Sequence, residues 1–147
     1  MWLRGGLLYC LLLLPGEAAA GKILDSSVQH EAGDYRLSVS AVIDAPLATV
    51  YRAITDYDNL AAISPSIIDS RSFATDDPRI HRVRSVIRVC ILVFCKRVVQ
   101  TQRVVQLDSR TIEAVMLPKG SDFRRGLARW QFTDEAGATV LFFFEEL

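Results

Sequence analysis

Apolar and polar side chains alternate from Tyr35 to Ile43, which is the period-two pattern of a strand that buries one face. After Asp44 the period changes to that of a helix, with apolar residues at Leu47, Val50, Tyr51, Ile54 and Tyr57. Asp44 is the expected N-cap of this helix, and Pro46 falls in its first turn. A further helical turn is expected over residues 60–63, ended by the Ser-Pro-Ser sequence at 64–66.

The rest of the chain predicts strands separated by turn residues. The expected strands cover residues 67–74, 80–89, 96–107, 111–116, 124–133 and 139–145. A strand, a helical pair and a run of antiparallel strands predict an α+β fold with one curved sheet. Residues 141–144 are all apolar, so both faces of the last strand are expected to be covered.

The first twenty residues have the pattern of a secretory signal peptide. Arg4 is followed by a short apolar run at 7–14 and by the small residues Ala18, Ala19 and Ala20. We expect cleavage after Ala20 and a periplasmic or secreted protein, with an uncleaved N-terminal anchor as the alternative. Residues 21–33 are expected to form a flexible lead-in, and residues 34–147 a single domain.

Composition narrows the possible functions. The formal net charge is zero and 50% of the residues are hydrophobic, so no global charge draws the chain to nucleic acid. The two histidines, His30 and His81, fall in the lead-in and at an expected outer strand position, without metal-ligand spacing. No catalytic triad or phosphate-binding glycine loop is present. The sequence therefore predicts no catalytic residue, metal or cofactor.

Two segments resemble one known superfamily. They are DAPLATVYRAITDYDNLAAISPS, which begins at Asp44, and LPKGSDFRRGLARWQF, residues 117–132. Both resemble the START-like helix-grip (SRPBCC) superfamily, in particular the branch of polyketide cyclases and coenzyme Q-binding proteins. The resemblance spans residues 34–147. It implies a cavity for an apolar ligand, and in this superfamily a long C-terminal helix usually closes that cavity. Such a helix is not evident before Leu147, so we expect an open apolar face.

The resemblance implies a carrier for a lipid or quinone, and the signal-peptide pattern implies that it is exported. An enzyme of the polyketide cyclase/dehydratase type is the alternative. Ionisable groups inside the cavity would favour the enzyme, with Glu113, Arg129 and Tyr51 as candidates. A ribosome-binding role, known among relatives, disagrees with the predicted signal peptide. The residues expected to contact the ligand lie on the helix, on the late strands and in one loop: Val50, Tyr51, Ile54, Phe123, Trp130, Phe132, Phe142, Ile91, Leu92, Val93 and Phe94.

Cys90 and Cys95 flank that loop of four apolar residues and are expected to face each other across a hairpin. In an oxidising compartment a disulfide is favoured over two buried thiols. Hairpin tips are normally polar, so the apolar tip is expected to gate the cavity or enter a bilayer surface, with packing against the first helix as the alternative.

A run of cations without acidic residues extends from Arg79 to Gln106. Arg82, Arg84 and Arg88 share one strand parity and are expected on the outer face of the sheet. A basic face beside an apolar tip suits an anionic membrane surface. The alternative is a solvated face whose arginines pair with carboxylates of other strands.

Overall fold

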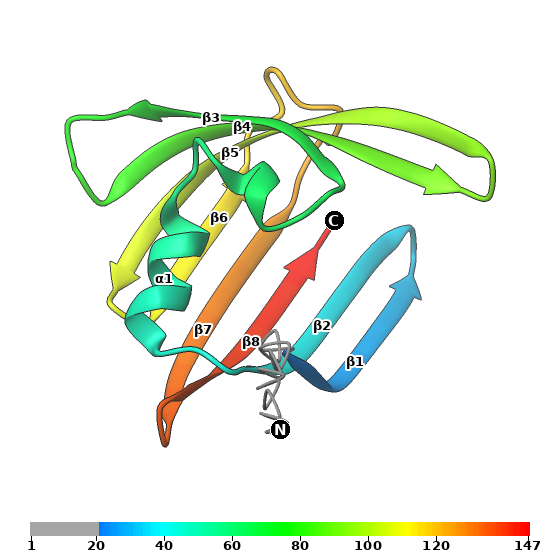
Figure 1. Ribbon diagram of the computed structural model, residues 1–147. Helices are drawn as coiled ribbons and strands as arrows, with labels where there is room; N and C mark the ends of the chain where they lie inside the picture. The colour runs from blue at the N-terminus through cyan, green and yellow to red at the C-terminus, as the bar shows by residue number, and fades with distance from the viewer. Residues whose placement is uncertain (1–20) are drawn as a thin grey trace, which may run out of the picture.

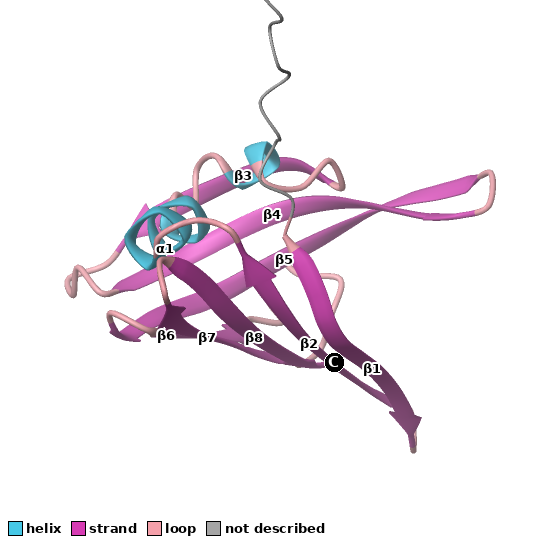
Figure 2. Cartoon of the chain, turned by 60° about the horizontal axis from the view of Figure 1, so that its bottom comes forward, coloured by secondary structure: helices cyan, strands magenta, loops and turns pink. Residues whose placement is uncertain are grey.

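The computed structural model describes residues 21–147, and the predicted signal peptide lies outside them. One curved antiparallel sheet of eight strands wraps around a short helix (Figures 1 and 2). The strands follow the order β1-β2-β8-β7-β6-β5-β4-β3. Their bounds are β1 Lys22–Glu31, β2 Asp34–Ile43, β3 Ile67–Ala74, β4 Ile80–Ile91, β5 Phe94–Asp108, β6 Thr111–Met116, β7 Leu127–Glu135 and β8 Ala138–Glu146. The predicted α+β class and curved antiparallel sheet are confirmed.

Helix α1, Leu47–Thr55, lies on the concave face of the sheet, which we call the inner face; the opposite face is the outer face. Val50 is buried at the helix centre, and Leu47, Tyr51 and Ile54 pack around it because their spacing puts them on one side of the helix. A 3-10 turn, η1 Leu60–Ala62, follows where the second helical turn was predicted. Among residues 21–147, no helix is long and apolar enough to cross a membrane.

The predicted N-cap at Asp44 is wrong by two residues. Pro46 occupies the cap position with extended backbone angles, and no side chain caps the helix. The residue before a proline is disfavoured in the helical region, so Ala45 stays outside the helix and the helix starts later. Thr139, which is fully buried on β8, donates a hydrogen bond from its hydroxyl to the carbonyl oxygen of Ala45 at 2.7 Å. This bond ties the entry of the helix to the sheet.

Residues 21–33 differ from the expected flexible lead-in, because Lys22–Glu31 form the edge strand β1 paired along its length with β2. All ten of its residues are exposed, so it lacks the buried face that produces an alternating pattern. Backbone pairing forms the strand instead, helped by Ala32 and Gly33, whose positive φ angles suit a two-residue hairpin turn.

The core lies between α1 and the middle of the sheet. Its buried apolar residues are Val50, Tyr57, Val83, Val104, Ile112, Ala114, Ala128 and Phe132. The strand parity predicted for the arginines is confirmed: Val83 is buried on the inner face, whereas Arg82, Arg84 and Arg88 are exposed on the outer face. His81, expected at an outer position, shares the parity of Val83 and packs its ring 5.1 Å from that of Tyr57.

Candidate functional site

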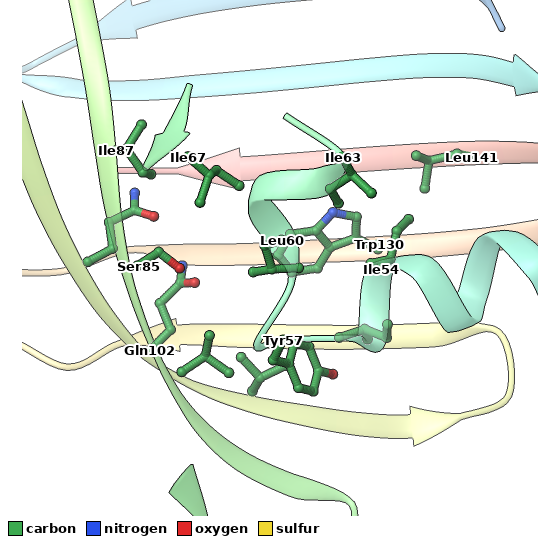
Figure 3. A pocket seen from close by; sticks show the side chains of 14 residues that line it. Ile54, Tyr57, Leu60, Ile63, Ile67, Ser85, Ile87, Gln102, Trp130 and Leu141 are labelled. Atoms are coloured by element: carbon green, nitrogen blue, oxygen red, sulfur yellow. The ribbon is translucent and has the colours of Figure 1, made fainter. Parts of the chain in front are cut away.

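A cavity of about 330 Å³ lies between the inner face of the sheet and the segment that joins α1 to β3 (Figure 3). This volume is at the lower end of the range for small-molecule sites. Strands β3 to β8 supply one wall, and α1, η1 and their connections supply the other. The lining residues are Ile54, Tyr57, Leu60, Ile63, Ile67, Val83, Ser85, Ile87, Gln100, Gln102, Val104, Ile112, Trp130 and Leu141.

The apolar part of the lining comes from the periodicities of the sequence. On β4, Val83 and Ile87 share the inner parity, whereas Arg82, Arg84 and Arg88 have the outer parity. From β7 and β8, Trp130 and Leu141 project into the same space, with Ile54 opposite them on the last turn of α1 (Figure 3). Trp130 also packs against the ring of Phe143 at 5.1 Å, which fixes its position on the inner face.

Three polar side chains interrupt this apolar lining on adjacent strands. Ser85 on β4 pairs in register with Gln100 on β5, and Gln102 is the next inner residue of β5. Among residues 21–147, none of these three side chains makes a hydrogen bond to another protein group. Their polar atoms are not sealed in the interior either, because no fully buried side-chain nitrogen or oxygen lacks a partner. Their hydroxyl and amide groups are therefore available to a molecule in the cavity.

Tyr57 is the one lining residue with a titratable side chain in the described part of the chain. Its phenolic oxygen accepts a hydrogen bond from Nε2 of Gln106 at 3.2 Å, away from the amide groups of the cavity wall. Burial raises the pKa of Tyr57, and the hydrogen bond from Gln106 opposes that shift without reversing it. The phenol is therefore neutral at physiological pH and cannot serve as a base.

The ionisable candidates for an enzymatic site lie outside the lining. Glu113 and Arg129 form an ion pair on the outer face, across β6 and β7. Tyr51 on α1 donates a hydrogen bond to the backbone oxygen of Asp108 at 3.1 Å, and burial followed by the charge of Asp108 raises its pKa. Glu145 is half-buried on β8, where burial raises its pKa, but it too lies outside the cavity.

The structure brings together only some of the residues expected to contact a ligand. Ile54 and Trp130 line the cavity, whereas Val50, Tyr51 and Phe132 form the core beneath it. The other candidates lie elsewhere: Phe123 in the loop between β6 and β7, Phe142 exposed on the outer face of β8, and Ile91, Leu92, Val93 and Phe94 at the far end of the β4–β5 hairpin. Ligand contact by any of these residues stays a prediction.

Sequence reasoning missed Ser85, Gln100 and Gln102. The alternation along β4 could have placed Ser85 on the inner face, because Ser85 follows Arg84 and shares the side of Val83. The inner positions of Gln100 and Gln102 on β5 could not be predicted in this way, because polar and apolar residues do not alternate regularly between residues 96 and 107.

The cysteines lie directly opposite each other, as predicted, with the sulfur atoms at bonding distance and the Cα atoms 4.0 Å apart. The expected four-residue loop between them is shorter: Ile91 and Phe94 pair with each other, and only Leu92 and Val93 form the turn. The oxidation state of the pair in the cell stays a prediction. Among residues 21–147, no cluster of three or more histidine, cysteine, aspartate or glutamate side chains could hold a metal ion.

Comparison with solved structures shows the same fold in several proteins. The aromatase/cyclase Zhui from a Streptomyces species superimposes with a TM-score of 0.64 at 17% identity, over 77% of this chain and 67% of that one. A protein from Thermus thermophilus superimposes with a TM-score of 0.63 at 21% identity, over 75% of this chain and 71% of that one. A START superfamily protein from Mycobacterium smegmatis superimposes with a TM-score of 0.64 at 16% identity, over 76% of this chain and 74% of that one.

Comparison by sequence gives a family, although no curated protein matches the chain. Residues 35–144 match the family model described as polyketide cyclase / dehydrase and lipid transport. The matched region contains α1, η1 and every residue that lines the cavity. The chain therefore belongs to the polyketide cyclase/dehydrase and lipid transport family.

Proposed function

We propose that the protein binds an apolar small molecule with a neutral polar end, of the lipid or quinone class, and carries it without changing it chemically. The observation that carries this proposal is the chemistry of the cavity lining. Ten of its fourteen residues are apolar, and the other four offer only amide and hydroxyl groups. No carboxylate, histidine, lysine or arginine lines the cavity in the described part of the chain.

The polar wall selects the kind of head group. Amide N–H groups of Gln100 and Gln102 can donate to a carbonyl or hydroxyl oxygen, and Ser85 can donate or accept. A charged head group would lose its hydration in an apolar cavity with no opposite charge to replace it, which is costly. A quinone carbonyl or a neutral lipid hydroxyl fits this lining better than a phosphate or a carboxylate.

Replacing both Gln100 and Gln102 with leucine should separate recognition of the head group from burial of apolar surface. We expect the affinity for decylubiquinone to fall about 3- to 10-fold, which corresponds to losing one or two neutral hydrogen bonds. Binding of decylbenzene, which has no carbonyl, should be unchanged or stronger. Isothermal titration calorimetry measures both affinities.

The matched control is Gln131→Leu, because this glutamine is exposed on the outer face of β7. It should leave both affinities unchanged. Equal losses for the two probes in the double variant, or no binding of either probe to the wild type, would contradict the proposal.

A second candidate is a cyclase/dehydratase reaction in the same cavity, favoured by the family and by the unpartnered polar groups of Ser85, Gln100 and Gln102. Such a reaction joins an enol carbon to a carbonyl carbon and then expels water, so a group must accept and return protons. The lining offers only Tyr57, whose raised pKa keeps it protonated. The carrier function is therefore preferred, and analysis of the ligand after incubation distinguishes the two.

We also propose that the protein acts outside the cytoplasm with Cys90 and Cys95 joined as a disulfide. This rests on the predicted signal peptide and on the directly opposed pair in the β4–β5 ladder. Thiol titration of protein exported by its own host, unfolded without reductant, should find neither cysteine reactive. Two reactive thiols per mature chain would overturn the proposal.

A further inference from the structure

The β4–β5 hairpin projects beyond the body of the sheet (Figures 1 and 2). Its neighbour β3 begins at Ile67, which pairs with Ile87, and no residue of β3 lies beside the hairpin beyond that pair. The last hydrogen bond on this side runs from the amide of Arg88 to the carbonyl oxygen of Ser66. On the other side, the loop after β6 stays beside β5 only as far as Val99, which bonds to Asp122. Residues 89–97 therefore pair only with each other in the described part of the chain. This segment is the projecting hairpin.

The tip of the projecting hairpin is entirely apolar and exposed. Ile91, Leu92, Val93 and Phe94 are 73%, 92%, 86% and 79% exposed. The alternative prediction that this tip packs against the first helix is therefore wrong. Beside it, a shallow hollow of about 310 Å³ is lined by Val89, Ile91, Phe94, Cys95, Lys96 and Val98. An exposed apolar cluster of this kind usually marks a contact with a partner or a membrane.

The backbone conformation at the tip also indicates that the apolar side chain of Leu92 has a role other than forming the turn. Leu92 has a φ angle of 54°, in the left-handed region where glycine is the usual residue. The same position of the β1–β2 and β7–β8 turns is held by Ala32 (φ 53°) and Ala136 (φ 52°), and each is followed by a glycine, Gly33 or Gly137. At the β4–β5 turn a bulky side chain takes the strained position instead, and its apolar surface faces solvent.

Cations surround the hairpin a short distance behind the tip. Arg88 and Arg97 are paired on the outer face, three residue pairs from the pair of Ile91 and Phe94, or about 10 Å along the strands. Lys96 lies one pair nearer the tip on the inner face. None of the three forms an ion pair among residues 21–147. The nearest carboxylates along the hairpin, Asp69 and Asp122, lie beside Val86 and Val99, farther from the tip.

We propose that the projecting hairpin docks the protein on an anionic membrane surface, with its apolar tip inserted end-on. Interfacial elements bury their apolar side chains by about 5–10 Å, and the cations about 10 Å behind the tip would then lie at the head-group level. The charge and the spacing fit a bilayer with acidic phospholipids better than a protein groove. The docking stands independently of what the cavity binds.

The first test is sedimentation with vesicles of phosphatidylcholine mixed with phosphatidylglycerol, compared with vesicles of phosphatidylcholine alone. The mature protein should bind the anionic vesicles more tightly. Leu92→Ser combined with Phe94→Ser should weaken binding at least about tenfold at every salt concentration, because apolar burial is not screened. Arg88→Gln combined with Arg97→Gln should weaken it by about fivefold per cation at low salt, and less at high salt.

Arg84→Gln is the matched control for orientation. Arg84 lies on the same outer face but seven pairs from the tip pair, about 24 Å away, which is about three Debye lengths at physiological salt. End-on docking predicts little effect of this change. A loss equal to that of the Arg88 and Arg97 variant would show that the outer face lies flat on the bilayer, which would overturn the proposal.

Leu92→Gly separates docking from folding. Glycine relieves the left-handed strain, so the melting temperature should be unchanged or higher, while vesicle binding falls. Unchanged vesicle binding in this variant and in the Leu92 and Phe94 double variant would overturn the proposal. So would a wild type that ignores vesicles and forms dimers that the double variant converts to monomers, because the tip would then bind a second copy.

Discussion

Replacing Phe132 with alanine is expected to lower the free energy of unfolding by about 3–5 kcal/mol, the usual loss for a large core aromatic. Phe132 on β7 is 2% exposed and holds α1 against the sheet through an edge-on contact with the ring of Tyr51 at 5.6 Å. Its removal opens a cavity beneath the helix, which adds to the lost burial of the ring. Denaturant unfolding followed by circular dichroism measures the change.

Phe142→Ala is the matched control for this prediction. Phe142 pairs with Gln131, one residue along from the pair of Phe132 and Leu141, but it points to the outer face and is 42% exposed. We expect a loss within about 1 kcal/mol. Equal losses in the two variants would show that α1 does not depend on the inner face of β7 for its position.

Filling the cavity is expected to abolish ligand binding while leaving the fold intact. Ser85 is 7% exposed on β4 and lines the cavity, so Ser85→Trp places a large ring in the space that a ligand would occupy. We expect the affinity for decylubiquinone to fall at least about tenfold, because the clash acts on the ligand directly. The existing space limits the overpacking cost to about 1–3 kcal/mol.

Arg84→Trp adds the same ring one residue away, on the exposed outer face of β4. It should bind decylubiquinone as the wild type does, and both variants should keep the circular dichroism spectrum of the wild type. Wild-type affinity in Ser85→Trp would show that the ligand binds elsewhere on the protein.

The parts of the fold that the sequence predicts well are those in which one face is buried and the other solvated. Strand β2, helix α1 and the outward arginines of β4 show clear periods of two or 3.6 residues, and each is found where the period predicts it. Edge strand β1 has no buried face and gave no such pattern. The two-sided apolar run at the end of the chain predicted cover on both faces, yet Phe142 remains exposed.

The candidate site was harder to predict, for a physical reason. Large aromatic residues are expected to contact the ligand because of their size. In this fold, however, Phe132 fills the core and Phe142 faces outward. The polar wall of the cavity depends on which neighbouring strands bring Ser85 and Gln100 together, and on the parity of β5. Pairing between strands is long-range information, and the local period of a single strand does not contain it.

Native mass spectrometry of the mature protein after incubation with decylubiquinone tests the carrier function most directly. We predict a complex of one protein and one ligand, which Ser85→Trp does not form, and release of the ligand with its mass and chromatographic retention unchanged. A ligand that leaves the protein rearranged or short of one water, or a wild type that forms no complex, would contradict the account.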